Sequence, residues 1–234
     1  MDSNEKFIKN IILHKLLSND SKYGVVYTCY YNDKYSAVKI VSLNSGVHYD
    51  AITKKHFNGD KTLIKNIDVE KYYDKNSFIF DQILFIKKKV MKNDAFALEI
   101  AKQQKMYELS FSPQIHGYCI YDKLPVHYGF IVMDLVDCTL KDIIMKRDIT
   151  DEENFIVTKK INKMHLEYKI IHNDLKPSNI GLILDHKKQI EKCIILDCVK
   201  CDFHYDMESE KIHVLIRNEW NYYNRRLYNN ITAR

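Results

Sequence analysis

The chain has 234 residues, of which 46% are hydrophobic, enough to bury the core of one domain or of two small lobes. The 36 basic and 31 acidic residues leave a net charge of only +5, which is a weak indication of an anionic partner and does not indicate nucleic-acid binding. No apolar run approaches the roughly 20 residues of a membrane-spanning helix, and the six cysteines follow no apolar N-terminal stretch of signal-peptide type. We therefore expect reduced thiols, a cytoplasmic location and no membrane association.

The first part of the chain is expected to be rich in strands. Asn32-Asp33 separates two runs of β-branched and aromatic residues and predicts a hairpin turn. A later segment carries apolar residues at helical spacing, and Ser112-Pro113 follows its end. The pattern predicts strands at 11–17, 24–29 and 34–41, a helix at 93–109 and a strand at 129–136.

The second part is expected to be mainly helical, with one hairpin. Its last segment combines aromatic residues with a basic face around Arg217, Arg225 and Arg226. The pattern predicts helices at 139–146, 152–168 and 208–234 and a hairpin of strands at 180–184 and 192–196. A strand-rich part followed by a helix-rich part predicts an α+β fold of two lobes, and ligands commonly bind between such lobes.

The strongest chemical signal is the octapeptide HNDLKPSN at residues 172–179, between a predicted helix and a predicted hairpin. Phosphoryl transfer to a hydroxyl needs a carboxylate that accepts the hydroxyl proton, a cation near the moving phosphoryl group, and a side-chain oxygen for a metal ion. Asp174, Lys176 and Asn179 provide these three groups. The alternative is a polar turn that caps a helix.

This octapeptide resembles the catalytic loop of the protein kinase family, H-R-D-L-x-x-x-N. Lys176 and Pro177 are typical of its serine/threonine members. The resemblance covers roughly residues 17–201 and implies ATP and Mg²⁺ as cofactors and a protein substrate. The low Gly and Pro content and the many Lys, Asn, Ile and Tyr residues indicate an AT-rich genome, such as that of a large DNA virus or of an intracellular microbe. The chain resembles the short, divergent kinases of large DNA viruses. For a viral protein the expected location is the host cytoplasm.

The resemblance also implies a second metal-binding carboxylate at the end of the hairpin that follows the loop. Asp197 stands there in Asp197-Cys198-Val199, where the family has D-F-G. The triplet Asp202-Phe203-His204 shares more residues with D-F-G, but no apolar strand precedes it. Asp197 is therefore preferred over Asp202.

Upstream, Ser36-Ala37-Val38-Lys39-Ile40 resembles the strand whose lysine holds the α and β phosphates of ATP. A lysine within an apolar strand is otherwise unusual, because an unpaired buried ammonium is costly, although a surface lysine on an edge strand is the alternative. Of the glycine-rich loop that precedes this strand in the family, only Gly24 and Val26 match.

The partner of Lys39 is expected on the helix at 93–109, where Glu99 is preferred and Gln103 is the competing alignment. The resemblance implies that Met133, Asp134 and Leu135 form the adenine-binding hinge and that Asp137 lies near the ribose. A plain core strand is the alternative for this segment. These nucleotide-binding assignments follow from the resemblance alone.

Four residues with the spacing C-x4-C-x2-C-x2-H (Cys193, Cys198, Cys201 and His204) suggest a zinc site. The spacing is weak evidence, because strand alternation points Cys193 and Cys198 to opposite faces and no second cysteine pair is present. We do not expect this site to form.

The resemblance predicts two lobes of unusual proportions. Residues 1–136 form the N-terminal lobe, with a long insertion at about 42–92, and residues 137–234 form a shortened C-terminal lobe. Only 33 residues follow Cys201, so the later helices of the family cannot fit. Either a partner completes this lobe or the last helix covers the core.

Three functions remain after these considerations. The first is a serine/threonine protein kinase, and the intact Lys39, Asp174, Asn179 and Asp197 favour it. The second is a pseudokinase that acts as a binding or regulatory module, and the reduced glycine loop and the altered D-F-G triplet favour it. The third is a small-molecule phosphotransferase, which the lysine after the catalytic aspartate disfavours. Asn173 replaces the family's arginine, so we expect no gating by a phosphorylated activation segment.

Overall fold

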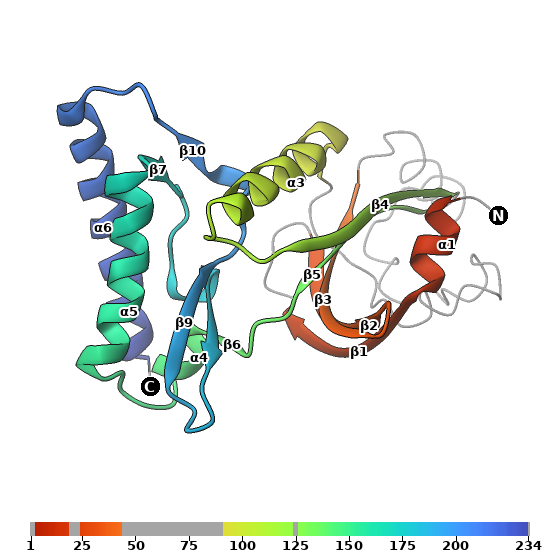
Figure 1. The fold of residues 1–234 in the computed structure, drawn as a ribbon, viewed down its shortest axis with the longest axis horizontal. Helices are drawn as coiled ribbons and strands as arrows, with labels where there is room; N and C mark the ends of the chain where they lie inside the picture. Colours follow the sequence, from red (N-terminus) through yellow and green to blue (C-terminus); the bar gives the residue numbers. More distant parts are fainter. Residues whose placement is uncertain (1–2, 19–23, 44–90, 124–125, 234) are drawn as a thin grey trace, which may run out of the picture. The chain divides into compact units, whose positions relative to one another are not determined.

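The computed structural model describes residues 3–18, 24–43, 91–123 and 126–233, and it is a mixed α+β structure (Figure 1). The chain divides into two compact units. The first unit comprises Met1–Ala97 and Ile115–Leu135, and the second comprises Leu98–Gln114 and Val136–Arg234. Nearly all of the predicted insertion at 42–92 lies outside the described residues.

The first unit is built on a five-stranded antiparallel sheet with the order β1-β2-β3-β5-β4. Its core consists of apolar side chains from all five strands and from α1, among them the fully buried Val38, Ile40 and Phe130. The helices and strands that belong to this unit or begin in it are α1 (Ser3–Lys9), β1 (Ile11–Ser18), β2 (Gly24–Tyr31), β3 (Lys34–Ser42), α3 (Asn93–Glu108), β4 (Ile115–Lys123) and β5 (Val126–Asp134).

The hairpin of β2 and β3 confirms the prediction made from Asn32-Asp33. Both turn residues have positive φ, 47° and 62°, which matches the right-handed twist of the two strands that they join. The predicted strand at 129–136 is present, but both of its ends are shifted: β5 begins at Val126 and ends at Asp134. The sequence did not predict α1 or β4.

The second unit packs helices against a small sheet of order β6-β8-β9. Its core is a continuous apolar cluster that includes Leu140, Ile161, Leu175 and Ile195, all fully buried. The regular elements of this unit are β6 (Cys138–Thr139), α4 (Leu140–Ile144), α5 (Asp151–Asn162), η3 (Lys163–Glu167), β7 (Ile170–Ile171), η4 (Pro177–Asn179), β8 (Ile180–Leu184), β9 (Ile190–Ile195), η5 (Cys198–Lys200), β10 (Asp202–Phe203) and α6 (Ser209–Ile231).

The helix predicted at 152–168 is present, but its last turn differs. Thr150 caps its N-terminus in a reciprocal capping box with Glu153, so α5 begins at Asp151. From Lys163 to Glu167 the chain widens into the π-helix η3, a feature that is rare and often lies near functional sites. Two side chains of η3, Met164 and His165, are buried.

The Glu153 carboxylate joins three parts of the second unit. Arg147 donates to both of its oxygens, at 2.7 and 2.6 Å, and the backbone amides of Thr150 and Ile190 donate at 3.0 and 2.9 Å. The Arg147 hydrogen bonds are the main cause that lowers the pKa of Glu153 to about 2. One carboxylate therefore connects the segment after α4, the start of α5 and the start of β9 by hydrogen bonds.

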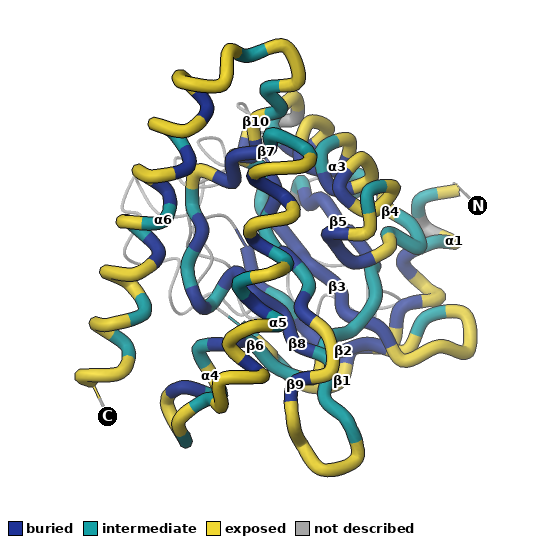
Figure 2. Tube along the Cα trace, turned by 60° about the vertical axis from the view of Figure 1, so that its left-hand side comes forward, coloured by how far each residue is buried: buried dark blue, intermediate teal, exposed yellow. Residues whose placement is uncertain are grey.

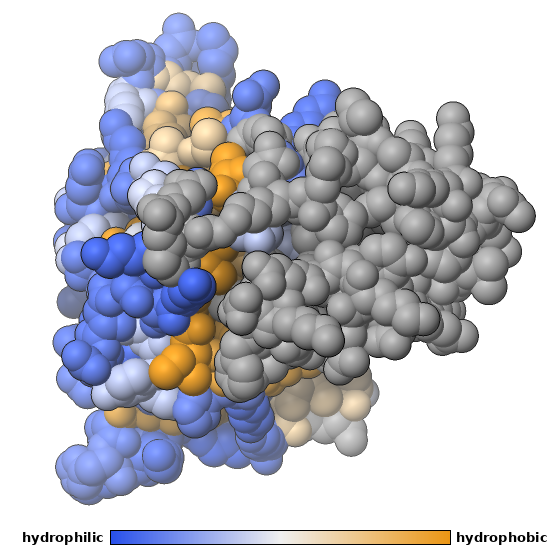
Figure 3. Space-filling model, turned by 90° about the vertical axis from the view of Figure 1, so that its right-hand side faces the viewer, coloured by the Kyte–Doolittle hydropathy of each residue, from blue (hydrophilic) through white to orange (hydrophobic). Residues whose placement is uncertain are grey.

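The described surface on the face shown in Figure 3 is mainly hydrophilic, with apolar residues gathered in a narrow band. Single exposed apolar side chains such as Phe155 and Leu166 are common on folded proteins. Within the described ranges, no helix has both the length and the apolar character needed to cross a membrane.

We predict that Glu153→Gln lowers the free energy of unfolding by about 2 kcal/mol at pH 7, an amount reduced by the solvent around the 38% exposed Arg147 side chain. The folded pKa lies below the usual 4.5, so the stabilisation is present above about pH 4.5 and is lost as the pH falls toward 2. Urea unfolding of wild type and variant from pH 7 to pH 3 measures the difference. The exposed Glu152→Gln is the control, and a deficit that does not shrink on acidification would contradict the prediction.

Candidate active site

The octapeptide at residues 172–179 forms a loop between two short elements of the second unit. It leaves β7 after Ile171 and enters η4 at Pro177, whose ring is tolerated at the first position of a helical turn. Leu175 is fully buried in the main core cluster, while Asp174 and Lys176 flank it and are only partly buried. The loop therefore has an apolar anchor between two charged side chains.

Asp174 is the centre of a small network of charged and polar groups. Lys176 Nζ lies 3.3 Å and Lys200 Nζ 3.4 Å from the same carboxylate oxygen, Oδ2. The hydroxyl of Tyr222 donates to the other oxygen, Oδ1, at 3.2 Å. One carboxylate oxygen is thus paired with cations, and the other accepts a hydrogen bond from a hydroxyl.

Asn179 and Asp197 are brought together by backbone hydrogen bonds. The amide nitrogen Nδ2 of Asn179 donates to the carbonyl of Asp174 at 3.0 Å, which orients the side chain and leaves Oδ1 as its ligand atom. The backbone N–H of Leu196, the residue before Asp197, donates to the carbonyl of Asn179 at 2.9 Å. Oxygen ligands of this kind suit Mg²⁺, so both residues fit the metal role expected of them.

Asp197 has a left-handed backbone, with φ 58° and ψ 56°. The three residues after it form the 3₁₀ turn η5, and Val199 in this turn does not have positive φ. Val199 stands where the D-F-G triplet has glycine, the residue that most readily adopts positive φ. In this chain the unusual conformation lies at the first residue of the triplet, and aspartate tolerates it better than most residues do.

His172 supports the loop from inside the core and has no exposed surface. Burial lowers its pKa below the usual value, with the Leu196 carbonyl opposing the shift, so the ring is neutral at pH 7. Nε2 is 2.8 Å from the Leu196 carbonyl oxygen, and Nδ1 accepts from the backbone N–H of Asp174 at 3.3 Å. The neutral ring therefore joins the loop that carries Asp174 to the segment after β9 that carries Asp197.

A buried carboxylate on α6 holds the same loop from the other side. Glu219 accepts hydrogen bonds from the backbone amides of His172 and Asn173, at 2.9 and 2.5 Å, and lies 2.8 Å from His165 Nε2 on η3. Buried residues recur along α6, as Figure 2 shows, and Glu219 is one of them. A charge this deep in the structure requires several donors, and the three groups provide them.

Asn173 closes the loop on its exposed side. Its φ is 63°, a conformation that asparagine tolerates better than most residues, and its Nδ2 donates to the Lys200 carbonyl and to Asp202 Oδ2. Asp202 also lies 3.7 Å from Lys102 Nζ and is exposed in β10, which pairs with β7. Asp202 is thus part of the support around Asn173, which favours Asp197 as the metal ligand.

The zinc set suggested by C-x4-C-x2-C-x2-H is wrong in its membership. Cys193 lies in the core on β9, and the only described group of three possible metal ligands is His172, Cys198 and Cys201, whose ligand atoms lie within 4.8 Å of one another. Both ring nitrogens of His172 already have hydrogen-bond partners, and the Cys201 hydrogen bond and burial raise the pKa of Cys198 well above its usual range. An imidazole whose two nitrogens are both hydrogen-bonded offers no free ligand atom for a metal ion.

Lys39 and the two glycine-loop residues lie in the sheet of the first unit. Lys39 is in β3, directly opposite Val26 on β2 and Ile131 on β5, and it is 8% exposed. Gly24 begins β2, and a Cβ there would lie 2.1 Å from the Ile40 carbonyl oxygen, so no larger residue fits without a shift of the backbone. The buried lysine excludes the surface edge-strand alternative.

The expected hinge residues lie where the chain passes along the sequence from the first unit to the second. Met133 and Asp134 end β5, and the Asp134 carboxylate is paired with Lys34 and His116 at 2.7 and 2.8 Å. Leu135 follows the strand. Asp137, in the second unit, accepts from the backbone N–H of Leu184 at 2.8 Å. The carboxylates of Asp134 and Asp137 thus have structural partners within their own units.

Of the two candidates for the partner of Lys39, Gln103 is engaged elsewhere. Its side-chain Nε2 donates to the Pro113 carbonyl at 3.3 Å, and its backbone carbonyl accepts from Ser112 Oγ at 2.8 Å. Glu99 is 1% exposed, and its charge is close enough to Cys198 to contribute to the raised pKa of that thiol. Lys39 and Glu99 belong to different units, and their pairing remains a prediction.

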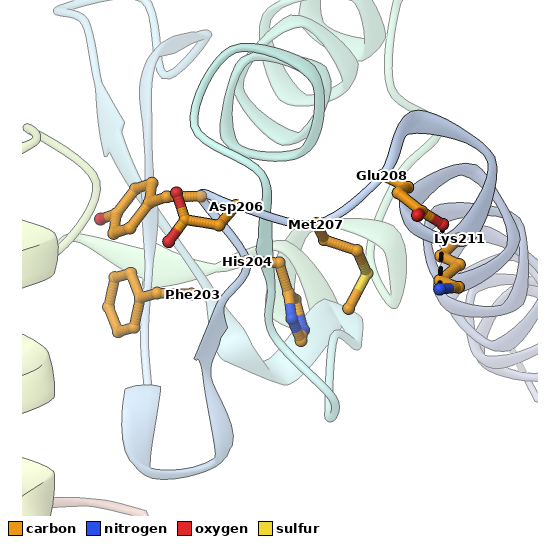
Figure 4. Close-up of a pocket in the computed structure, with 7 residues that line it drawn as sticks. Phe203, His204, Asp206, Met207, Glu208 and Lys211 are labelled. Carbon is orange, nitrogen blue, oxygen red and sulfur yellow. Dashed lines mark ion pairs between the residues drawn. The ribbon is translucent and has the colours of Figure 1, made fainter.

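A shallow, open pocket of about 470 Å³ lies on the segment that leads into α6 (Figure 4). Figure 4 shows His204 and Met207 beside each other, while Glu208 and Lys211 form an ion pair of 2.9 Å at the start of the helix. None of the residues that the sequence predicted for the site lines this pocket. It therefore has no part in the arrangement around Asp174.

The sequence analysis missed four residues of this arrangement: His165, Lys200, Glu219 and Tyr222. One signal for Glu219 was present, because it follows Ile212 and Ile216 at helical spacing and precedes Tyr223, so it falls on an apolar stripe. A carboxylate on such a stripe indicates a buried partner. For Tyr222 and Lys200 no comparable signal exists.

Known proteins add no assignment here, because no family model matches the chain and no curated protein matches its sequence. The functional interpretation therefore depends on the geometry of the site.

We predict that Glu219→Gln destabilises the protein by about 2–4 kcal/mol, because an amide that replaces the carboxylate provides only one acceptor oxygen for three buried donors. Urea unfolding measures the loss. Faster hydrogen exchange at the amides of His172 and Asn173 locates it to the loop. The control is Glu210→Gln, an exposed carboxylate on the same helix, and equal losses in both variants would contradict the anchoring role.

Proposed function

We propose that the chain is a serine/threonine protein kinase of two-lobed fold, which transfers the γ-phosphoryl group of ATP to a hydroxyl of a protein. The observation that carries the proposal is the group formed by Asp174, Lys176 and Asn179, with Asp197 bonded to it through the backbone of Leu196. A base, a cation and two oxygen ligands on adjoining segments are the parts that this reaction needs.

Asp174 is the proposed general base. Its Oδ1 already accepts a hydrogen bond from a hydroxyl at 3.2 Å, which is the reach needed to take a proton from an acceptor. The backbone carbonyl of Asp174 accepts a hydrogen bond from Asn179, and its backbone N–H donates one to His172. These two bonds fix the backbone from which the carboxylate extends. The rate gain in such sites comes mainly from positioning and electrostatics.

Lys176 is the proposed cation for the moving phosphoryl group. Its Nζ is 3.3 Å from Asp174 Oδ2, so the proposed cation lies directly beside the proposed base. The other carboxylate oxygen, Oδ1, faces the Tyr222 hydroxyl. Its side chain is one-third exposed, which leaves it accessible to a substrate. Negative charge that develops on the transferred group is thus met by a positive charge beside the base.

Asn179 and Asp197 would hold Mg²⁺, which neutralises phosphate charge when it is bound. Lys39 is proposed to hold the α and β phosphates and Glu99 to orient Lys39. Gly24 and Val26 are proposed to cover the phosphates.

The adenosine part is proposed to bind at Met133, Asp134 and Leu135 through backbone groups, with Asp137 near the ribose. The carboxylates of Asp134 and Asp137 are engaged by Lys34 and His116 and by the Leu184 amide, which fits a backbone role better than a side-chain role.

The pseudokinase alternative is supported by one observation. Both oxygens of Asp174 are engaged by groups of the chain itself, since Tyr222 occupies Oδ1 and two lysines occupy Oδ2. A binding module tolerates this arrangement permanently, whereas a kinase must be able to release one oxygen for its substrate. A transfer assay separates the two functions.

We predict that Asp174→Asn lowers phosphoryl transfer to an added protein at least about 100-fold, because the amide cannot accept the hydroxyl proton. Nucleotide binding should stay nearly unchanged, since Asp174 is proposed to act on the hydroxyl. Transfer from radiolabelled ATP and a fluorescent-nucleotide titration measure the two properties. Asp151→Asn, at an exposed position on α5, is the control, and wild-type transfer by the Asp174 variant would sink the assignment.

We further predict that Asp197→Ala removes the Mg²⁺ dependence of nucleotide binding, because the proposed metal ligand is lost. Asp202→Ala is the matched control, since Asp202 is exposed and bonded to Asn173. Nucleotide titrations with and without Mg²⁺ give the comparison. If Asp202→Ala abolishes the metal dependence and Asp197→Ala does not, the choice between the two carboxylates is wrong.

A further inference from the structure

The hydroxyl of Tyr222 occupies the position on Asp174 that a phosphoryl acceptor has to take. It is 3.2 Å from Oδ1, the oxygen that neither Lys176 nor Lys200 contacts. A general base must lie within hydrogen-bond reach of the proton that it removes, and this phenol satisfies that condition. The inference that follows depends on the proposed kinase function.

Tyr222 is held in this position by the helix on which it lies. One turn earlier on α6, Glu219 is fixed by the two loop amides and by His165. The next residue, Tyr223, is 2% exposed within the main core cluster. Tyr222 therefore approaches Asp174 on a helix that is anchored to the same loop, and the contact does not depend on a mobile side chain alone.

The surroundings of Tyr222 are rich in positive charge that the proposed mechanism does not use. Lys200 lies 3.4 Å from the Asp174 carboxylate. The guanidinium groups of Arg226 and Arg225 lie 5.2 and 5.9 Å from the centre of the Tyr222 ring. A phosphate on this residue would carry close to two negative charges and would find cations nearby to pair with.

We propose that Tyr222 is a modification site that the chain phosphorylates on itself. Its proposed substrates in other proteins are serine and threonine hydroxyls, whereas this phenol is accepted because the fold already holds it against Asp174. The phenolic oxygen forms a bond to the γ-phosphorus of ATP, the bond between that phosphorus and the β,γ-bridging oxygen breaks, and ADP leaves. The phenolic proton passes to Asp174 Oδ1 and then to solvent. The same hydroxyl competes with an added protein for Asp174 until it is modified or moved.

The test uses the full chain with Mg²⁺ and ATP, followed by mass spectrometry of its peptides. The expected result is phosphotyrosine at position 222, formed with a first-order rate constant that does not change when the protein is diluted. Tyr222→Phe should reduce the tyrosine label at least about tenfold and raise transfer to added dephosphorylated casein, because the competing hydroxyl is gone. Tyr228→Phe, an exposed tyrosine on the same helix, should leave the label unchanged.

Three results would overturn the inference. Phosphorylation of casein with no phosphate at Tyr222 rejects the site and leaves the proposed function intact. A Tyr222→Phe variant that loses transfer to casein shows that the phenol only positions Asp174. Absence of both ATP binding and transfer to any acceptor rejects the proposed function itself, and the inference with it.

Discussion

The arrangement around Asp174 depends on the buried carboxylate of Glu219. A charged group removed from water is costly, and the cost is offset only when several donors surround it. Two of the donors here are consecutive backbone amides of a loop in which Asn173 has positive φ, a conformation that leaves those amides outside any regular ladder. The loop amides and the Glu219 carboxylate on the helix therefore satisfy each other's hydrogen-bonding needs. We expect neither the loop nor the helix to keep this conformation without the other.

The helix that carries Glu219 also provides apolar cover beside the loop. In the structure α6 lies beside β7 and η4, and its buried residues Ile212 and Ile216 pack with Ile171 just before the loop. One helix thus provides both apolar cover and the buried carboxylate.

Much of the fold could be predicted because its signals are local. The turn Asn32-Asp33 and the capping box before α5 each act within a few residues. The strand β4 was missed although Ile115, Tyr118 and Ile120 favour strands, because Gly117 interrupts the run and the pairing with β5 shifts register between Ile115 and Gly117. Asp174, Lys176 and Asn179 could be recognised as one motif. Glu219 and Tyr222, in contrast, contact the loop although they lie 46–48 residues further along the sequence. No local pattern records such contacts.

The same helix, α6, anchors the loop through Glu219 and contacts Asp174 through Tyr222. Glu219 and Tyr222 are three residues apart on α6, so a shift of the helix that frees Asp174 Oδ1 also strains the hydrogen bonds to the loop amides. Under the proposed function, a substrate hydroxyl would reach Asp174 most easily by displacing the Tyr222 side chain, while the helix stays in place. The Tyr222 side chain is half-buried and its ring lies beside the guanidinium groups of Arg225 and Arg226, whereas Tyr223 is buried in the main core cluster, so a rotation of Tyr222 disturbs the core less than a movement of Tyr223 would. Access to Asp174 Oδ1 thus depends on one rotatable side chain on an anchored helix.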